Sequence, residues 1–286
     1  MRYLVHDVFT DRPFGGNQLA VIPDAEALPE EALQQIAREF NFSETTFVLP
    51  PADPANTARV RIFTPTMEIP FAGHPVIGTA VALAGLGYGA EQRLELGIGT
   101  LPCRVEGNRA EFATSRRLER LAAPAPELVA RCLSLSPAQI VQTTHPPLQA
   151  SLGLAFTIVE LDSRAAVSAA RPDIAAIREG AGKHPAGLDF AIFCYARNDT
   201  AVFARMFAPL DNILEDPATG SAAATLCALL SEELARPLSL RIEQGVDMGR
   251  PSLIRATSET EGGTCSKVRI SGRAVAVMRG ELLWPK

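Results

Sequence analysis

Three side chains suited to proton transfer stand out in this sequence. Glu44 opens a β-rich run, and His74 and Asp216 each lie in a short loop just before an apolar segment. A partly buried glutamate near a cleft has a raised pKa and can accept and return protons near neutral pH. These residue types predict acid/base chemistry, although a surface glutamate or a helix-capping partner explains Glu44 equally well.

Both loops precede helices that are expected to be buried. The segments 76–86 and 222–230 are apolar on nearly every face, which is typical of enclosed helices, and both are too short to span a bilayer. Their first N–H groups carry partial positive charge and are expected to attract anions. For one such helix, capping by Thr219 or Ser221 is the simpler interpretation. The presence of two such loops, one with a histidine and one with an aspartate, favours a functional role over capping alone.

The two helices belong to an internal repeat. Residues 61–86 and 205–230 align without a gap at an offset of about 144, and each copy reads as an R-x-F-x-P strand, a loop and a helix. Leu188 occupies the position equivalent to Glu44, so the carboxylate is present in one copy only. The repeat predicts two similar halves with a cleft between them as the natural site.

Periodicity and turn residues predict the other elements of a mixed α/β (α+β) fold. The first half spans 1–115 and the second 116–265, with 116–126 as the crossover and a C-terminal hairpin within 266–286 closing on the first half. The hairpin pairs 268–270 with 274–284 around a turn at Ser271-Gly272. The expected helices are 29–40, 126–133 and 172–179, the last ended by Gly180. The expected strands are 3–9, 18–22, 45–49, 59–64, 94–96, 102–105, 108–113, 155–161, 190–196, 202–207 and 238–244.

Two amides follow a glycine pair near the N-terminus. Gly15-Gly16 suits a tight turn, and Asn17 and Gln18 after it could direct their amides into a cleft. Turn chemistry explains Asn17 equally well.

Composition excludes several classes of function. The chain has 286 residues, a formal net charge of −5 and no basic stripe, so nucleic-acid binding is not expected. The five cysteines show no C-x-x-C spacing and the four histidines no H-x-x-x-H spacing, so neither disulfides nor a metal site is expected. Because charged residues occur at positions 7, 11 and 12, a secretory segment is not expected. Reduced, buried thiols in a cytoplasmic protein are the expectation.

Five blocks of sequence together resemble the phenazine-biosynthesis isomerase (PhzF-like) family. They read DVFTDRPFGGNQLAVI, FNFSETTFV, TPTMEIPFAGHPVIGTA, MFAPLDNILEDPATGSAAATL and EQGVDMGRPS, and they extend from Asp7 to Ser252. The resemblance implies the diaminopimelate-epimerase-like fold, in which each of two halves wraps a mixed, barrel-like sheet around a central apolar helix. That architecture agrees with the repeat and with the two apolar helices.

The resemblance also implies a function and a site. The founding enzyme of the family isomerises trans-2,3-dihydro-3-hydroxyanthranilate without metal or organic cofactor, and its relatives are commonly homodimers. The family motifs place the catalytic groups at Glu44, His74 and Asp216. The positions that match the substrate pocket are Asn17, Gln18, Gly73, Gly220 and Ser221.

We therefore expect a one-base proton shift on a small, carboxylate-bearing substrate. Related racemases and epimerases use two cysteines, one ahead of each central helix, whereas here the nearest cysteines, Cys103 and Cys227, lie outside those loops. Ala72 replaces a cysteine that many relatives carry before the glycine and histidine. A racemase-like enzyme acting on another small acid, and a small-molecule binding protein without catalysis, are the alternatives.

Overall fold

The structure is a computed structural model that describes residues 1–186 and 188–283. The chain divides into two compact units. Unit 1 contains Met1–Thr114 together with the chain from Ser271 onward, and unit 2 contains Ser115–Ile270. The C-terminal segment thus returns to the unit in which the chain begins.

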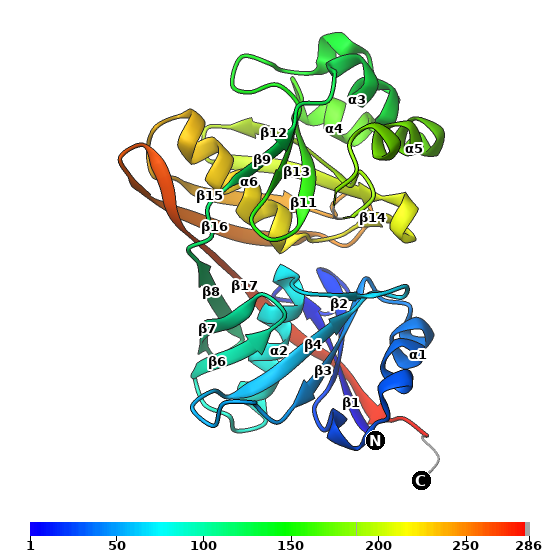
Figure 1. Cartoon of the computed structure of the whole chain (residues 1–286), viewed down its shortest axis with the longest axis vertical. Helices are drawn as coiled ribbons and strands as arrows, with labels where there is room; N and C mark the ends of the chain where they lie inside the picture. The colour runs from blue at the N-terminus through cyan, green and yellow to red at the C-terminus, as the bar shows by residue number, and fades with distance from the viewer. Residues whose placement is uncertain (187, 284–286) are drawn as a thin grey trace. The chain divides into compact units, whose positions relative to one another are not determined.

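Unit 1 is a closed mixed sheet around one helix, α2 (Figure 1). Strand β17 pairs with β1 on one side and with β8 on the other, which closes the ring β1-β2-β3-β4-β6-β7-β8-β17. Helix α2 packs against β1, β2, β3, β7 and β8. The strands are β1 (Arg2–Val8), β2 (Asn17–Ile22), β3 (Glu44–Leu49), β4 (Ala58–Phe63), β5 (Glu68–Ile69), β6 (Glu91–Leu96), β7 (Gly99–Glu106), β8 (Arg109–Thr114) and the part of β17 (Thr264–Glu281) from Ser271 onward, and the helices are η1 (Ala25–Ala27), α1 (Glu30–Phe40) and α2 (Gly73–Gly85).

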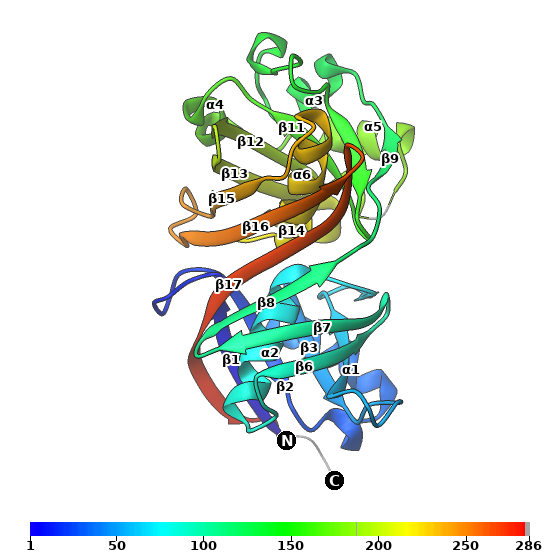
Figure 2. The same cartoon turned by 90° about the vertical axis from the view of Figure 1, so that its left-hand side faces the viewer.

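Unit 2 repeats this order of pairing around helix α6. The pairs β11–β12 and β13–β15 are parallel, as are β2–β3 and β4–β6 in unit 1. Helices α3, α4 and α5 share one hydrophobic cluster with strands β11, β12 and β13, and Figure 2 shows the strands of this unit from a second direction. The strands are β9 (Glu119–Ala122), β10 (Leu148–Ser151), β11 (Ala155–Glu160), β12 (Ile192–Asn198), β13 (Ala201–Ala208), β14 (Ile213–Asp216), β15 (Ser239–Gln244) and β16 (Ser252–Glu261), and the helices are α3 (Pro126–Cys132), η2 (Pro137–Gln139), α4 (Arg164–Ala169), α5 (Ile174–Lys183), η3 (Pro209–Asp211) and α6 (Gly220–Glu233).

The repeat is visible in side-chain contacts as well as in topology. The Arg61 guanidinium lies 5.1 Å from the ring centroid of Phe63, and Arg205 lies 4.8 Å from that of Phe207. Each arginine also pairs with a glutamate of the short strand that follows, Glu68 in β5 and Glu215 in β14. The repeated arginine therefore joins the long strand of each unit to the short strand leading toward the central helix.

The central helices are buried, as their composition predicts. Ten residues of α2 and twelve of α6 are buried. Both helices begin earlier than predicted, at Gly73 and at Gly220, so His74 lies in the first turn of α2 rather than in the preceding loop. Among the residues that the structure describes, no helix is long and apolar enough to cross a membrane.

Two predictions based on glycine were wrong for the same physical reason. Gly272 lies inside β17 and not at a turn, because its backbone packs directly against the ring of Phe9. Gly180 lies inside α5 and does not end it, because a Cβ there would stand 2.5 Å from the Phe190 ring. The turn before β17 is Gly262-Gly263, where both residues have positive φ. Trp284, at the end of the predicted hairpin, lies outside the described residues.

Substitutions in α2 test how closely the sheet encloses it. A Cβ at Gly78 would lie 2.5 Å from Leu19 and 2.7 Å from Val8, whereas nothing lies within 4 Å of one at Gly85. We expect Gly78→Ala to lower the free energy of unfolding by about 1–3 kcal/mol through overpacking. Gly85→Ala should raise it by up to about 1 kcal/mol, because alanine is the better helix former. Urea unfolding of both variants measures the difference, and equal effects would contradict the close contact.

Candidate active site

The unit 1 candidates meet at one end of the closed sheet. Asn17 is the first residue of β2 and Glu44 is the first residue of β3, and these strands are parallel neighbours. His74 lies in the first turn of α2, inside the ring of strands. The start of two parallel strands and the start of the enclosed helix therefore place three of the predicted residues together.

These three side chains form a contact chain. Glu44 Oε2 lies 3.4 Å from His74 Nε2, and Asn17 Nδ2 lies 3.2 Å from His74 Nδ1. The Asn17 side chain and the Glu44 carboxylate therefore lie at opposite nitrogens of the imidazole ring.

Burial determines the charge of His74. Removal of the imidazole from water lowers its pKa to about 3, and a hydrogen bond with the Gln18 backbone acts in the opposite direction with a smaller effect. His74 is therefore neutral at physiological pH. The Glu44 side chain is only 12% exposed, so it is not a surface residue.

Gln18 and Gly73 are the other two predicted site residues of unit 1. Successive side chains of a strand point to opposite faces, so Gln18 lies on the other face of β2 from Asn17. Of the two predicted amides, Asn17 is the one that contacts His74. Gly73 is the buried first residue of α2, directly before His74.

The unit 2 candidates lie where β14 passes into α6. Asp216 is the last residue of β14 and is buried, and Gly220 and Ser221 are the buried first residues of α6. Thr219 is the N-cap residue of α6, but its side chain makes no capping hydrogen bond. Its hydroxyl instead donates to Asp216 Oδ2 at 2.6 Å. The capping interpretation of Thr219 is therefore wrong.

Sequence reasoning missed one functional candidate, Gln244. This residue ends β15, and its side-chain amide makes hydrogen bonds to the backbone of Asp216 and to both the backbone and the hydroxyl of Thr219. The available signal was its position in the EQGVDMGRPS block, where a glutamine precedes a glycine at the end of a strand.

The cysteines are buried free thiols, as predicted. Burial raises the pKa of four of them to about 12, so these thiols stay protonated at neutral pH: Cys103, Cys132, Cys194 and Cys227. The pKa of Cys265 is also raised by burial. A thiolate base of the kind that two-cysteine racemases use has no support here.

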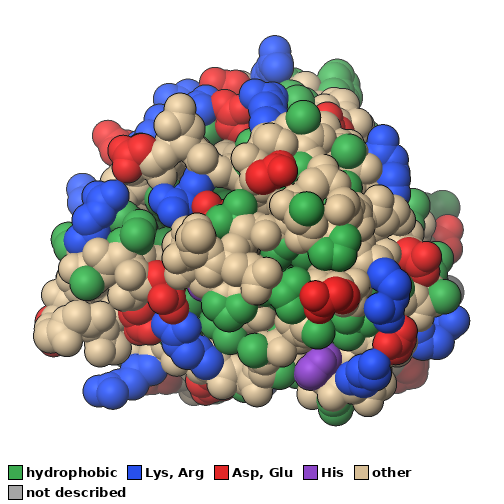
Figure 3. Space-filling model, turned by 90° about the horizontal axis from the view of Figure 1, so that it is seen from above, with side chains coloured by type: hydrophobic (Ala, Val, Ile, Leu, Met, Phe, Trp, Pro, Cys, Tyr) green, Lys and Arg blue, Asp and Glu red, His purple; other side chains and the backbone are tan. Residues whose placement is uncertain are grey.

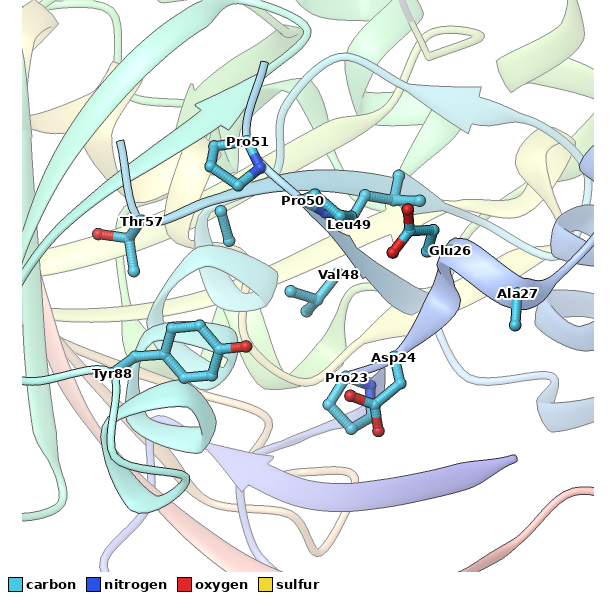
Figure 4. A pocket seen from close by; sticks show the side chains of 11 residues that line it. Pro23, Asp24, Glu26, Ala27, Val48, Leu49, Pro50, Pro51, Thr57 and Tyr88 are labelled. Atoms are coloured by element: carbon cyan, nitrogen blue, oxygen red, sulfur yellow. The ribbon is translucent and has the colours of Figure 1, made fainter. Parts of the chain in front are cut away.

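Two grooves on unit 1 lie apart from the predicted site residues. On the face shown in Figure 3, basic and acidic side chains are interspersed and do not form one basic patch. A groove of about 580 Å³ on unit 1 has Tyr88 and Asp24 on either side of Val48 (Figure 4), and a second of about 510 Å³ includes Arg59 and Glu95. Neither groove contains a predicted site residue. Within the described ranges, no three His, Cys, Asp or Glu residues form a potential metal site.

Comparisons with known proteins identify the family and the fold. A family model described as phenazine biosynthesis-like protein matches residues 6–280. An uncharacterized isomerase of Mesorhizobium japonicum is 39% identical, and a trans-2,3-dihydro-3-hydroxyanthranilate isomerase of Pseudomonas aeruginosa is 37% identical, each over 98% of both chains. The crystal structure of a PhzF-family protein of Bacillus anthracis has a TM-score of 0.86 over 99% of both chains, at 24% identity. The predicted fold class is confirmed.

The pKa of His74 predicts acid sensitivity of the fold. Its folded value of about 3 lies below its ordinary value of 6.5, so between these values the unfolded chain binds a proton that the folded chain does not. Stability is therefore retained above pH 6.5 and lost as the pH falls. Between pH 7 and pH 5 the wild type should lose about 2 kcal/mol more than His74→Gln. Urea unfolding at both pH values measures this loss, with the partly exposed His184→Gln as the control. An equal loss in all three proteins would contradict it.

Proposed function

Because the chain belongs to the phenazine biosynthesis-like (PhzC-PhzF) family and is an isomerase, we propose that it catalyses a one-base proton shift on a small substrate that carries a carboxylate. Trans-2,3-dihydro-3-hydroxyanthranilate is the first candidate, since relatives 36–37% identical over nearly the whole chain carry the name of its isomerase. Glu44 is the proposed base.

The single observation that carries this proposal is the contact between Glu44 and a buried, neutral histidine. Glu44 keeps a small exposed fraction, so a substrate carbon can reach its carboxylate, and His74 lies 3.4 Å behind it. The carboxylate takes a proton from an acidic carbon, and the electron pair of the broken C–H bond enters the adjoining π-system. The same carboxyl group then returns the proton to another carbon of that system.

His74 is suited to assist this transfer without changing its own charge. Its pKa of about 3 keeps the imidazole neutral, and its Nε2 lies beside the carboxylate. In the tautomer that carries its proton on Nε2, the ring can donate to the ionised glutamate or to negative charge that develops on the substrate. Asn17 holds the ring through its contact with Nδ1.

The start of α6 in unit 2 is proposed to recognise charged groups of a substrate. The first N–H groups of α6, at Gly220 and Ser221, form a local positive end that suits the carboxylate of a substrate. The buried Asp216 supplies a negative group for an amine on the same molecule. A substrate with both groups, such as an amino acid with an unsaturated ring, matches these two recognition elements.

The proton balance of this reaction is complete without a further reactant. One proton leaves one carbon and reaches another, and no electron is gained or lost, so we propose a reaction independent of a cofactor. The absence of cysteine from the loops before α2 and α6 disfavours a two-thiol racemase. A cytoplasmic location and a homodimer stay predictions.

Replacement of Glu44 tests the proposal. Glu44→Gln keeps the shape of the side chain but cannot accept a proton, so turnover should fall by about 10²–10⁴-fold. Glu31→Gln changes an exposed glutamate of the same unit and should convert substrate at the wild-type rate. Proton NMR of trans-2,3-dihydro-3-hydroxyanthranilate in D₂O follows both the isomerisation and the entry of deuterium.

Three other results would point elsewhere. Full turnover by Glu44→Gln would remove Glu44 from the chemistry. Deuterium at a stereocentre of another small acid, with racemisation, would support the racemase-like alternative. Saturable binding of the substrate with no exchange of any proton would support the binding protein.

A further inference from the structure

The side chain of Gln244 is enclosed beside the loop that joins β14 to α6. It is completely buried, with no solvent-exposed area. Its Oε1 accepts from the Thr219 N–H at 3.0 Å, and its Nε2 donates to the Asp216 carbonyl at 2.8 Å and to Thr219 Oγ1 at 2.9 Å. One side chain thus contacts the last residue of β14 and the last residue of the three-residue loop that follows it.

These contacts fix the direction of every proton in the chain of hydrogen bonds. A backbone N–H can only donate and a backbone carbonyl can only accept, so the Gln244 amide has a single orientation. Thr219 Oγ1 must then accept from Nε2. The hydroxyl proton of Thr219 is left to donate to Asp216 Oδ2, 2.6 Å away. Gln244 therefore determines that Asp216 receives a hydrogen bond.

The same chain of hydrogen bonds alters the capping of the N-terminus of α6. An N-cap threonine ordinarily accepts from an N–H of the first helical turn, which satisfies one of the free donors. Here the Thr219 side chain makes no such bond, since its hydroxyl is engaged by Gln244 and Asp216. Thr219 therefore leaves the first N–H groups of the helix uncapped by its own side chain.

The backbone of Gly245, next to Gln244, packs directly against the loop between β14 and α6. Gly245 has φ +72°, and a Cβ at this position would lie 2.6 Å from the carbonyl oxygen of Pro217. Only glycine permits this approach in this conformation. The loop is thus fixed by the Gln244 side chain and by the Gly245 backbone together.

We propose that Gln244 and Thr219 are positioning residues for the reaction. Gln244 turns the Thr219 hydroxyl away from the helix cap and onto Asp216. This hydrogen bond orients the aspartate as a charged group and keeps the start of α6 available to the substrate carboxylate. The inference rests on the proposed function, because it assigns the two residues to the site that contains Asp216.

Isosteric substitutions separate this role from simple packing. Both Thr219→Val and Gln244→Leu keep the side-chain volume. Thr219→Val removes the hydrogen bond to Asp216, and Gln244→Leu removes the amide that orients the Thr219 hydroxyl. Each should lower kcat by about 10–100-fold, as expected for loss of a hydrogen bond to a charged group. Thr219→Ser keeps the hydroxyl and should retain activity close to that of the wild type.

Gln92 of unit 1 provides a matched control. It is also buried, and its Nε2 donates to two backbone carbonyls, of Ala80 and of Gly89, so it ties α2 to the sheet as Gln244 ties α6. Gln92→Leu should lower stability as Gln244→Leu does, yet leave kcat unchanged. An equal loss of kcat in both leucine variants would overturn the inference, because a general packing defect would then explain it.

A second measurement is independent of turnover. The carboxyl ¹³C signal of Asp216, assigned by its disappearance in Asp216→Asn, can be titrated by NMR. Removal of the hydroxyl donor should move the titration midpoint to higher pH by about one unit in Thr219→Val, with no shift in Gln92→Leu. An unchanged midpoint in Thr219→Val would overturn the inference. If wild-type protein failed to convert the substrate, the proposed function would fall, and this titration would still decide the role of Thr219.

Discussion

Each unit must bury a helix that is apolar on nearly every face. A sheet that wraps around such a helix leaves its ends as the parts that can meet a ligand, and the N-terminal end carries free N–H groups. In both units a short strand, β5 or β14, leads the chain to this end. Enclosure of the helix therefore determines where a ligand can meet it. The residues around each helix start determine which groups that ligand would contact.

The two units share a framework and differ in the groups placed upon it. The arginine–phenylalanine contact and the pair of parallel strands occur in both. In unit 1 the helix start carries a neutral imidazole beside Glu44, whereas in unit 2 it carries a carboxylate held by Thr219. The two units thus share a scaffold but carry different polar clusters at their helix starts. A departure from the repeat at these positions is expected to mark function.

Much of this was predictable from the sequence, and the failures have identifiable causes. The repeat and the apolar helices predicted two similar units, and the long strands were found because their periodicity extends over several residues. Strands β5 and β14, of two and four residues, are too short to show a period. Gly180 and Gly272 were interpreted as chain breakers, whereas each makes room for an aromatic ring.

The polar contacts were less predictable than the elements. Membership of Glu44, His74 and Asn17 in a site could be inferred, but their mutual distances depend on the register between β2, β3 and α2. Gln244 was missed because it acts on a loop 25 residues earlier in the chain, and no local pattern reveals that pairing. Its effect on Thr219 reverses the capping role that the residue type suggests, so only coordinates could distinguish the two.

The strand β17 has a consequence for the order of events during synthesis. Residues Arg2–Val8 pair with residues near the C-terminus, and the Met1 amino group donates to the carbonyl of Leu282. The ring of strands in unit 1 cannot close until residues 271–281 of β17 have left the ribosome, whereas unit 2 is formed by one continuous stretch. The half that is translated first is thus completed last, and until then β1 and β8 remain open edges to which another chain can pair.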